Sequence, residues 1–185
     1  MDRDKEKILV ERAKYDKEAF GILFNEYFSL ILNYVFRRIG DRGDAEEITQ
    51  EVFLKAISSI STYKDRGIPY SSYLMRIAIN EVNDYVKKKR KIILMGDMRN
   101  VFKDYSSDDK KRKFLIIQRL LLKLPLKYQT VISLKYFEKM KIKEIAEVLN
   151  KNENTVKTLL RRGIKKLKEE IEKDETFSKE FGLNE

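Results

Sequence analysis

The chain has 185 residues, of which 42% are hydrophobic, enough for the buried core of one ordinary domain or of two small ones. It contains no Cys, which excludes disulfides and thiolate metal sites, and no His, which is the commonest metal ligand and general base. We therefore expect no catalytic residue, no metal and no cofactor. Its 40 Lys and Arg outnumber its 30 Asp and Glu, which indicates a nucleic acid or anionic membrane surface as partner, or a Lys-rich composition that only solvates helices.

The first residues of the chain show no targeting segment, and helical periodicity follows them. MDRDKEK has no apolar signal core, and no apolar run approaches the roughly 20 residues of a membrane span, so we expect a cytoplasmic protein without membrane insertion. From Asp16 to Gly40 apolar residues recur at helical spacing, with Asp16 placed to cap the helix and Gly40 to end it. After the turn DRGD a second helix is predicted to begin at Asp44. Its buried stripe is Ala45, Ile48, Val52, Ala56 and Ile60.

The other side of this second helix is acidic. Asp44, Glu47 and Glu51 lie on it, with Glu46 and Gln50 beside them. Acids in a first turn favour the helix macrodipole, but Glu51 lies two turns further along. On a basic protein such a face predicts docking to a positively charged partner. A row of acids along one helix does not converge on a single Mg²⁺, so a metal-dependent enzyme acting on nucleic acid is not expected.

A loop and a third helix follow. The segment YKDRGIPY, residues 63–70, has the Gly and Pro of a loop, and the helix after it has Leu74, Ala78 and Val82 on its apolar side. The opposite side carries an aromatic ring, amides and cations. They are Tyr73, Arg76, Asn80, Asn83, Asp84, Lys87 and Lys91. This set suits stacking, base-edge bonding and backbone contact with single-stranded nucleic acid, and it also describes a solvated surface helix, so the pattern does not choose between them.

Beyond this helix the periodicity fades and then returns. Residues 93–113 are polar and charged and predict a flexible linker between domains. Helical pattern resumes over residues 114–124 and stops before Pro125, which disfavours helical geometry in its predecessor. A further helix is predicted from about Pro125 to Phe137.

The last two predicted helices, KIKEIAEVL and NKNENTVKTLLRRGIKKLKEEI, are separated by a tight turn. Asn150 can adopt the left-handed conformation that ends a helix, and Asn152 can cap the next one. This pattern is typical of a helix-turn-helix, whose second helix enters the major groove of DNA. Its outer side offers groups that bond to base edges or grip phosphate, which favours duplex DNA binding over a merely solvated helix. These are Glu153, Asn154, Lys157, Thr158, Arg161, Arg162 and Lys165.

The C-terminal end of the chain is acidic, whereas the rest of the chain is basic. From Glu169 to Glu185 there are seven acids and two cations, so residues 1–168 hold 38 cations against 23 acids. The body is therefore strongly basic, and its acidic tail either screens the recognition helix or is simply solvated.

Four stretches together resemble the extracytoplasmic-function, or group IV, sigma factors of bacterial RNA polymerase. DAEEITQEVFLKA, residues 44–56, is similar to the helix that binds core polymerase. YSSYLMRIAINEVNDYVKKKRK, residues 70–91, is similar to the helix that melts and reads the minus-10 element. LPLKYQTVISLKYFEKMKIKEIAEVLN and NTVKTLLRRGIKKL, residues 124–150 and 154–167, resemble the domain that reads the minus-35 element. The resemblance covers nearly the whole chain, in the family's order and spacing.

The resemblance implies an all-α protein with two small helical domains joined by a flexible linker. Residues 1–92 would form a sigma region 2-like bundle and residues 114–172 a sigma region 4-like helix-turn-helix domain. Residues 93–113 would be the linker and residues 173–185 an acidic tail. The chain would then be an alternative sigma factor that binds core polymerase, reads minus-35 duplex DNA and opens the minus-10 element.

Implied partners are promoter DNA and core RNA polymerase, bound through its beta-prime coiled coil and beta flap. An anti-sigma factor is a further candidate. The alternative is a stand-alone helix-turn-helix regulator, which would bind duplex DNA without polymerase and use its N-terminal domain as a sensor or dimeriser.

The resemblance also implies roles for single residues. Core polymerase would be bound by Asp44, Glu47, Gln50, Glu51 and Phe53. Minus-10 DNA would be bound by Lys64, Arg66, Tyr70, Tyr73, Arg76, Asn80, Asn83, Lys87, Lys88 and Arg90, with loop 64–70 forming a pocket for a flipped base. Minus-35 DNA would be bound by Glu153, Asn154, Thr155, Lys157, Thr158, Arg161, Arg162 and Lys165. Tyr73 stands where the family usually has Trp, and Leu159, in place of the usual Arg, would touch a thymine methyl or pack inward.

Overall fold

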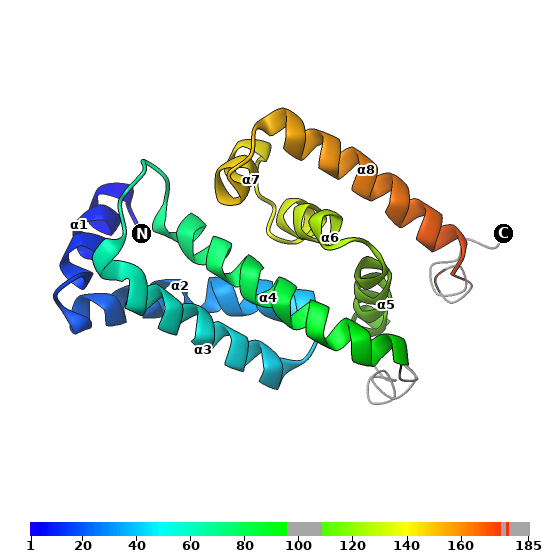
Figure 1. Cartoon of the computed structure of the whole chain (residues 1–185), viewed down its shortest axis with the longest axis horizontal. Helices are drawn as coiled ribbons and strands as arrows, with labels where there is room; N and C mark the ends of the chain where they lie inside the picture. The colour runs from blue at the N-terminus through cyan, green and yellow to red at the C-terminus, as the bar shows by residue number, and fades with distance from the viewer. Residues whose placement is uncertain (96–108, 175–176, 178–185) are drawn as a thin grey trace. The chain divides into compact units, whose positions relative to one another are not determined.

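The computed structural model describes residues 1–95, 109–174 and 177, and in this part of the chain all regular secondary structure is helical (Figure 1). Side chains are described for these residues except 89–95, 109–112, 114 and 115. The chain divides into two compact units, one comprising Met1–Asp84 with Ala146–Lys151 and the other Tyr85–Ile145 with Asn152–Glu185. The prediction of an all-α fold is therefore confirmed.

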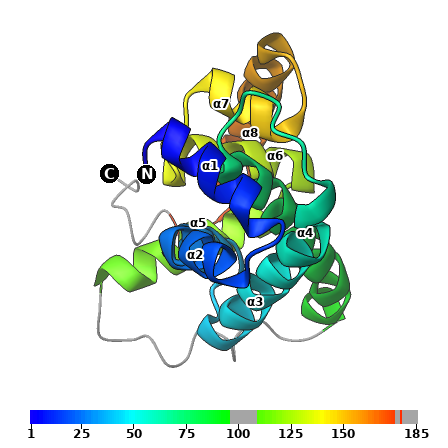
Figure 2. The same ribbon diagram turned by 90° about the vertical axis from the view of Figure 1, so that its left-hand side faces the viewer.

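The first 95 residues of the chain form a series of helices. They are α1 (Arg3–Ala13), α2 (Lys17–Ile39), α3 (Arg42–Ser59), the short 3-10 helix η1 (Ile60–Thr62) and α4 (Tyr70–Met95). Both α1 and α3 lie against α2 (Figures 1 and 2). Asp16 caps α2 by accepting from the Glu18 N–H at 2.9 Å, and Gly40 ends it with a φ of 81°, as predicted. The first helix, α1, was not among the predicted elements.

The helix α2 qualifies as a candidate membrane span by length and hydropathy alone, which the search for long apolar runs did not anticipate. Of its most apolar stretch, 44% is buried inside the protein. Leu23, Ile31 and Val35 have no exposed surface, because the neighbouring helices cover them. The apolar character of α2 is thus explained by its place in the core.

The next helix begins earlier than its pattern indicated. Asp41 rather than Asp44 caps α3, because the Asp41 carboxylate accepts the Asp44 N–H at 2.8 Å. Acid side chains are favoured caps of this kind, and Gly43 therefore lies within the first helical turn rather than in the preceding turn.

The remaining helices are α5 (Asp109–Lys123), α6 (Leu126–Ile132), the π-helical turn η3 (Ser133–Phe137), α7 (Ile142–Leu149) and α8 (Glu153–Glu172). Because α4 reaches Met95 and α5 begins at Asp109, both ends of the predicted linker are helical. Residues 96–108 lie outside the described part of the chain.

Within the second unit α8 packs against α6 and α5. Gly163 permits the close approach to α6, since a Cβ there would stand 3.2 Å from both Tyr128 Cβ and Ile132 Cδ1. The end of α8 is tied to α5 by Asp174, whose carboxylate accepts from Arg119 Nη2 at 2.7 and 2.9 Å and pairs with Lys123 at 3.4 Å. The first residues of the predicted acidic tail are therefore part of a folded unit.

Candidate nucleic-acid and protein interfaces

A pocket of about 240 Å³ lies between the end of α3, the loop after η1 and the start of α4. The rings of Tyr63 and Tyr73 stand in it with centroids 4.9 Å apart. Aromatic faces beside cations can accept a base by stacking and its phosphate by charge. The lining residues are Ser59, Thr62, Tyr63, Lys64, Arg66, Ile68, Tyr73 and Arg76.

Hydrogen bonding and burial fix the two pocket tyrosines. The hydroxyl groups of Tyr73 and Ser59 are 2.6 Å apart and hydrogen-bonded, which ties the first turn of α4 to the last residue of α3. Burial, and then the nearby Asp65 carboxylate, raise the pKa of Tyr63 to about 12, so its phenol stays neutral at physiological pH. The Tyr63 ring therefore presents an uncharged aromatic surface in the pocket.

Half of the pocket residues were predicted. The loop assignment included Lys64 and Arg66, and the α4 stripe included Tyr73 and Arg76. Tyr63, at the first position of the loop, was missed, although its place between the helices and a glycine-containing turn was a usable signal. Ile68 was not named as a contact residue, but it lies in the loop 64–70 that the resemblance implied as a pocket. Ser59 and Thr62 carried no pattern that indicated a site.

The structure corrects the predicted role of Tyr70. Its side chain is 1% exposed, so it lies in the core and not on a DNA-binding surface. The spacing of four residues to Leu74 explains this, because it puts Tyr70 on the apolar side of α4. Its ring packs edge-on against Tyr63 at 5.2 Å and lies 5.5 Å from the ring of Tyr73. Tyr70 therefore supports both pocket rings from within.

The other α4 residues predicted to bind minus-10 DNA differ in exposure. Asn80, Lys87 and Lys88 are exposed, whereas Asn83 is half-buried and accepts a hydrogen bond from Arg38 at 3.4 Å. The side chain of Arg90 belongs to those that the structure does not describe. An exposed amide and exposed cations on one helix remain compatible with binding a nucleic-acid strand.

On α3 the structure buries Phe53 and exposes its neighbour Leu54. Glu47, Gln50 and Glu51 are exposed, as the predicted docking face requires, and Asp44 is half-buried. Phe53, predicted on that face, is only 4% exposed and its ring lies 4.7 Å from that of Phe24. Leu54 is 59% exposed.

The physical reason is helical phase. Phe53 follows Thr49 by four residues and precedes Ala56 by three, so it belongs to the buried stripe. Leu54 follows Gln50 by four and Glu51 by three, so it extends the acidic face with an apolar side chain. The sequence signal for this exposed apolar side chain was a leucine that falls outside the spacing of the buried stripe.

The turn between α7 and α8 confirms both asparagine predictions. Asn150 has a φ of 51°, and the Asn152 side chain accepts the Thr155 N–H at 2.7 Å. On α8, six of the predicted contact residues are exposed, whereas Thr155 and Thr158 are half-buried. The exposed ones are Glu153, Asn154, Lys157, Arg161, Arg162 and Lys165. Leu159 is half-buried, between the two alternatives considered for it.

Family models match two separate stretches of the chain. Residues 23–92 match the family Sigma-70 region 2, and residues 114–167 match Sigma-70, region 4. The chain is 32% identical over 150 residues to the RNA polymerase sigma factor SigV of Bacillus subtilis, covering 81% of this chain and 87% of SigV. It is 31% identical over 172 residues to ECF RNA polymerase sigma factor SigW of the same organism, covering 85% and 91%.

Other similarities extend this picture. ECF RNA polymerase sigma factor BldN of Streptomyces coelicolor is 31% identical over 166 residues, and the match covers 86% of this chain but 63% of BldN. The structure of CnrH in complex with the cytosolic domain of CnrY is similar with a TM-score of 0.66 and 22% identity, covering 91% of this chain and 98% of that one. The sigma factor RpoE, solved with the anti-sigma factor NepR from Bartonella quintana, has a TM-score of 0.58 and 18% identity over 84% and 98%. The last two likenesses concern the fold.

Proposed function

Because the chain belongs to the sigma-70 family, in its extracytoplasmic-function group, we propose that it binds core RNA polymerase and directs promoter-specific initiation by reading minus-35 duplex DNA and opening the minus-10 element. The observation that carries the opening step is the tyrosine pocket at the start of α4. An extruded base needs an aromatic surface and a nearby cation, and this pocket offers both.

In the proposed opening step one minus-10 base leaves the duplex and stacks on the aromatic surface that Tyr63 and Tyr73 form together. Unstacking costs a few kcal/mol, and base–aromatic stacking returns about 1–3 kcal/mol per base. Lys64 and Arg66 at the pocket would contact the phosphates beside the extruded base. Asn80, exposed further along α4, offers an amide to a second base edge.

The duplex contact is proposed for α8. Arg161 and Arg162 are exposed in the middle of this helix, where guanidinium groups reach either guanine or phosphate. Glu153 and Asn154 lie at its N-terminal end, the part of a recognition helix that contacts base edges. Core polymerase would bind the α3 face formed by Glu47, Gln50, Glu51 and Leu54, which we call the docking face.

Reconstituted transcription tests this function. The purified chain is added to bacterial core polymerase and run-off transcripts are followed from a library of promoter fragments. We expect transcripts that appear only when the chain is present and that start at shared minus-35 and minus-10 sequences. No chain-dependent transcript over a range of salt concentrations would contradict the proposal.

A gel shift without polymerase separates the alternative regulator from the sigma factor. Tight, sequence-specific duplex binding by the chain alone would support the regulator. Weak binding that becomes specific on adding core polymerase would support the sigma factor. We further propose that the protein acts in the cytoplasm. We also propose an anti-sigma factor as partner, since RpoE, which has the same fold, was solved with one.

A further inference from the structure

A buried carboxylate on α1 holds the first residue of α4. Glu6 is 3% exposed, and its Oε1 accepts from the Tyr27 hydroxyl at 2.5 Å and from the Tyr70 N–H at 3.0 Å. The Arg3 guanidinium donates to its other oxygen. The Tyr70 N–H opens α4 and has no partner within its own helix, so Glu6 caps α4 from a separate helix. A negative charge at that end also favours the helix macrodipole.

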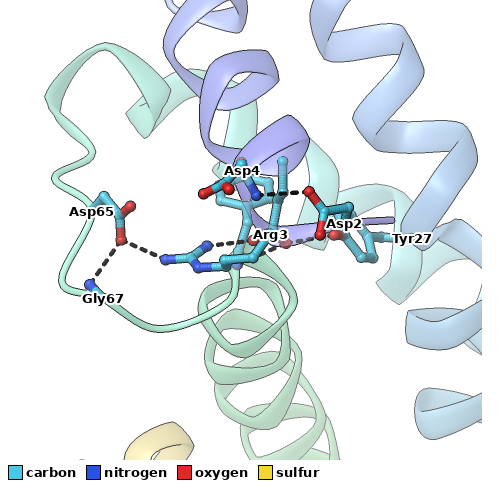
Figure 3. A network of polar contacts seen from close by, with 8 residues as sticks. Asp2, Arg3, Asp4, Tyr27, Asp65 and Gly67 are labelled. Atoms are coloured by element: carbon cyan, nitrogen blue, oxygen red, sulfur yellow. Dashed lines mark hydrogen bonds and ion pairs between the residues drawn. The ribbon is translucent and has the colours of Figure 1, made fainter.

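The same short helix holds the pocket loop at a second point. Arg3 Nη2 donates to Asp65 Oδ1 at 2.7 Å, and the same oxygen accepts the Gly67 N–H at 2.8 Å (Figure 3). The Gly67 N–H, and then the Arg3 guanidinium, lower the pKa of Asp65 below its usual value, so the carboxylate stays charged at neutral pH. Gly67 has a φ of 77°, a conformation that most residues avoid.

The two anchor points enclose part of the pocket. Arg66 and Ile68 line it and lie between Asp65 and Tyr70 in the chain. Tyr70 in turn packs against both pocket rings. Arg3 and Glu6 themselves lie before residue 23, where the match to Sigma-70 region 2 begins. The conformation of the pocket therefore depends on residues outside the matched family region.

We propose that α1 positions the base pocket, with Arg3 and Glu6 acting as positioning residues that hold the loop of residues 65–70 ready for an extruded base. Neither residue lines the pocket. The inference rests on the proposed function of that pocket. Without the ion pair the loop becomes ordered only when a base binds, which weakens capture and relaxes the choice among bases.

The Arg3–Asp65 pair provides the test, because Glu6 is buried and its loss would impair folding. Arg3→Met removes the ion pairs with Asp65 and Glu6 and keeps an unbranched apolar side chain. Asp65→Asn keeps a carbonyl oxygen for the Gly67 N–H but removes the charge that Arg3 binds. Arg12→Met is the matched control, since Arg12 lies on the same helix and pairs with Asp16 at 2.8 Å.

The first measurement needs no DNA. Amide hydrogen exchange of the full chain should show faster exchange at Gly67 and Tyr70 in Arg3→Met, by about tenfold for the loss of one charged hydrogen bond, and no change in Arg12→Met. Equal exchange in the two variants would overturn the inference and leave the proposed function of the pocket intact.

The second measurement uses holoenzyme and single-stranded minus-10 oligonucleotides that carry 2-aminopurine beside the extruded position and each of the four bases at it. We expect Arg3→Met and Asp65→Asn each to weaken binding about tenfold and to flatten the base preference, the double variant being no worse than Arg3→Met alone. Effects that multiply in the double variant, or match Arg12→Met, would overturn the inference. If the wild-type holoenzyme shows no base preference, the proposed function of the pocket is contradicted, and this inference with it.

Discussion

Two glycines within helices differ in how much space surrounds them. Gly21 in α2 has no heavy atom within 4 Å of the place where a Cβ would stand. Gly163 in α8 is buried, and a Cβ there would approach Tyr128 Cβ to 3.2 Å. Tyr128 Cβ is bonded directly to the backbone and yields less easily than the end of a flexible side chain.

We expect alanine to have opposite effects at these two positions. Gly21→Ala should raise the free energy of unfolding by about 0.5–1 kcal/mol, because alanine loses less backbone entropy in a helix. Gly163→Ala gains the same term, but overpacking costs about 1–3 kcal/mol, so a net loss of about 1 kcal/mol is expected. Urea unfolding of both variants measures the difference. A stability increase at Gly163 would show that α6 moves away at little cost.

The carboxylate of Asp174 shows how neighbouring groups stabilise a single charge. Although burial opposes it, the Phe177 N–H and the Arg119 guanidinium lower the pKa of Asp174, so this carboxylate is charged in the folded protein at neutral pH. A lowered folded pKa stabilises the protein above the unfolded value, and that contribution is lost as the pH falls through the folded value. The end of α8 is therefore held by charge as well as by packing.

The helix α3 has one face that packs in the core and another that is exposed to solvent. Its inner side carries Ala45, Val52 and Ala56, all without exposed surface, and Phe53. Its outer side carries the docking face. An exposed leucine among acids is typical of a protein interface, where an apolar anchor is surrounded by polar groups.

Substitutions on the two faces of α3 should separate binding from stability. Leu54→Ala should weaken binding to core polymerase about tenfold and leave the unfolding transition unchanged, and Glu51→Lys should also weaken binding, through charge. Phe53→Ala should lower the free energy of unfolding by about 3–5 kcal/mol. Titration of labelled chain with core polymerase and thermal unfolding measure the two effects. Ile22→Ala, at an exposed apolar residue of α2, is the control; equal polymerase affinity of Leu54→Ala and Ile22→Ala would remove Leu54 from the interface.

For the whole molecule, charge is the property that the sequence distributes most unevenly. Residues 1–168 hold 38 cations against 23 acids, whereas seven acids and two cations follow. A basic body attracts DNA over a range set by screening, independently of base sequence. The acidic docking face on α3 is then a local exception that would direct the chain to a second, basic partner.

This charge distribution predicts a steep salt dependence of promoter binding by the holoenzyme. Each phosphate contact contributes about 0.9 to the slope of log K against log salt concentration. Arg162→Gln on α8 should lower that slope by about one unit, if Arg162 contacts phosphate as proposed. Lys17→Gln, at an exposed cation on α2, should leave the slope unchanged. Fluorescence anisotropy between 50 and 300 mM salt, roughly the range in which such contacts are lost, measures it.

Features encoded by neighbouring residues were readable from the chain. The caps at Asp16 and Asn152, the left-handed Asn150 and the buried stripes follow from interactions over at most four positions, and the structure confirms them. Helical periodicity also predicted the all-α class. Where local patterns competed, as at Asp41 against Asp44, the predicted helix start was wrong by two residues.

Features that join distant parts of the chain became visible only when the helices packed. Arg3 reaches Asp65 across 62 positions, and Glu6 reaches Tyr70 across 64. No local period connects such residues, because their contact depends on how α1 lies against α2 and on the path of the loop before α4. The same packing buries Tyr70 beneath the pocket and adds Tyr63 to it. Short-range interactions thus determine the helices of this chain, and its sequence motifs indicate its family, whereas the shape of the tyrosine pocket arises from long-range contacts.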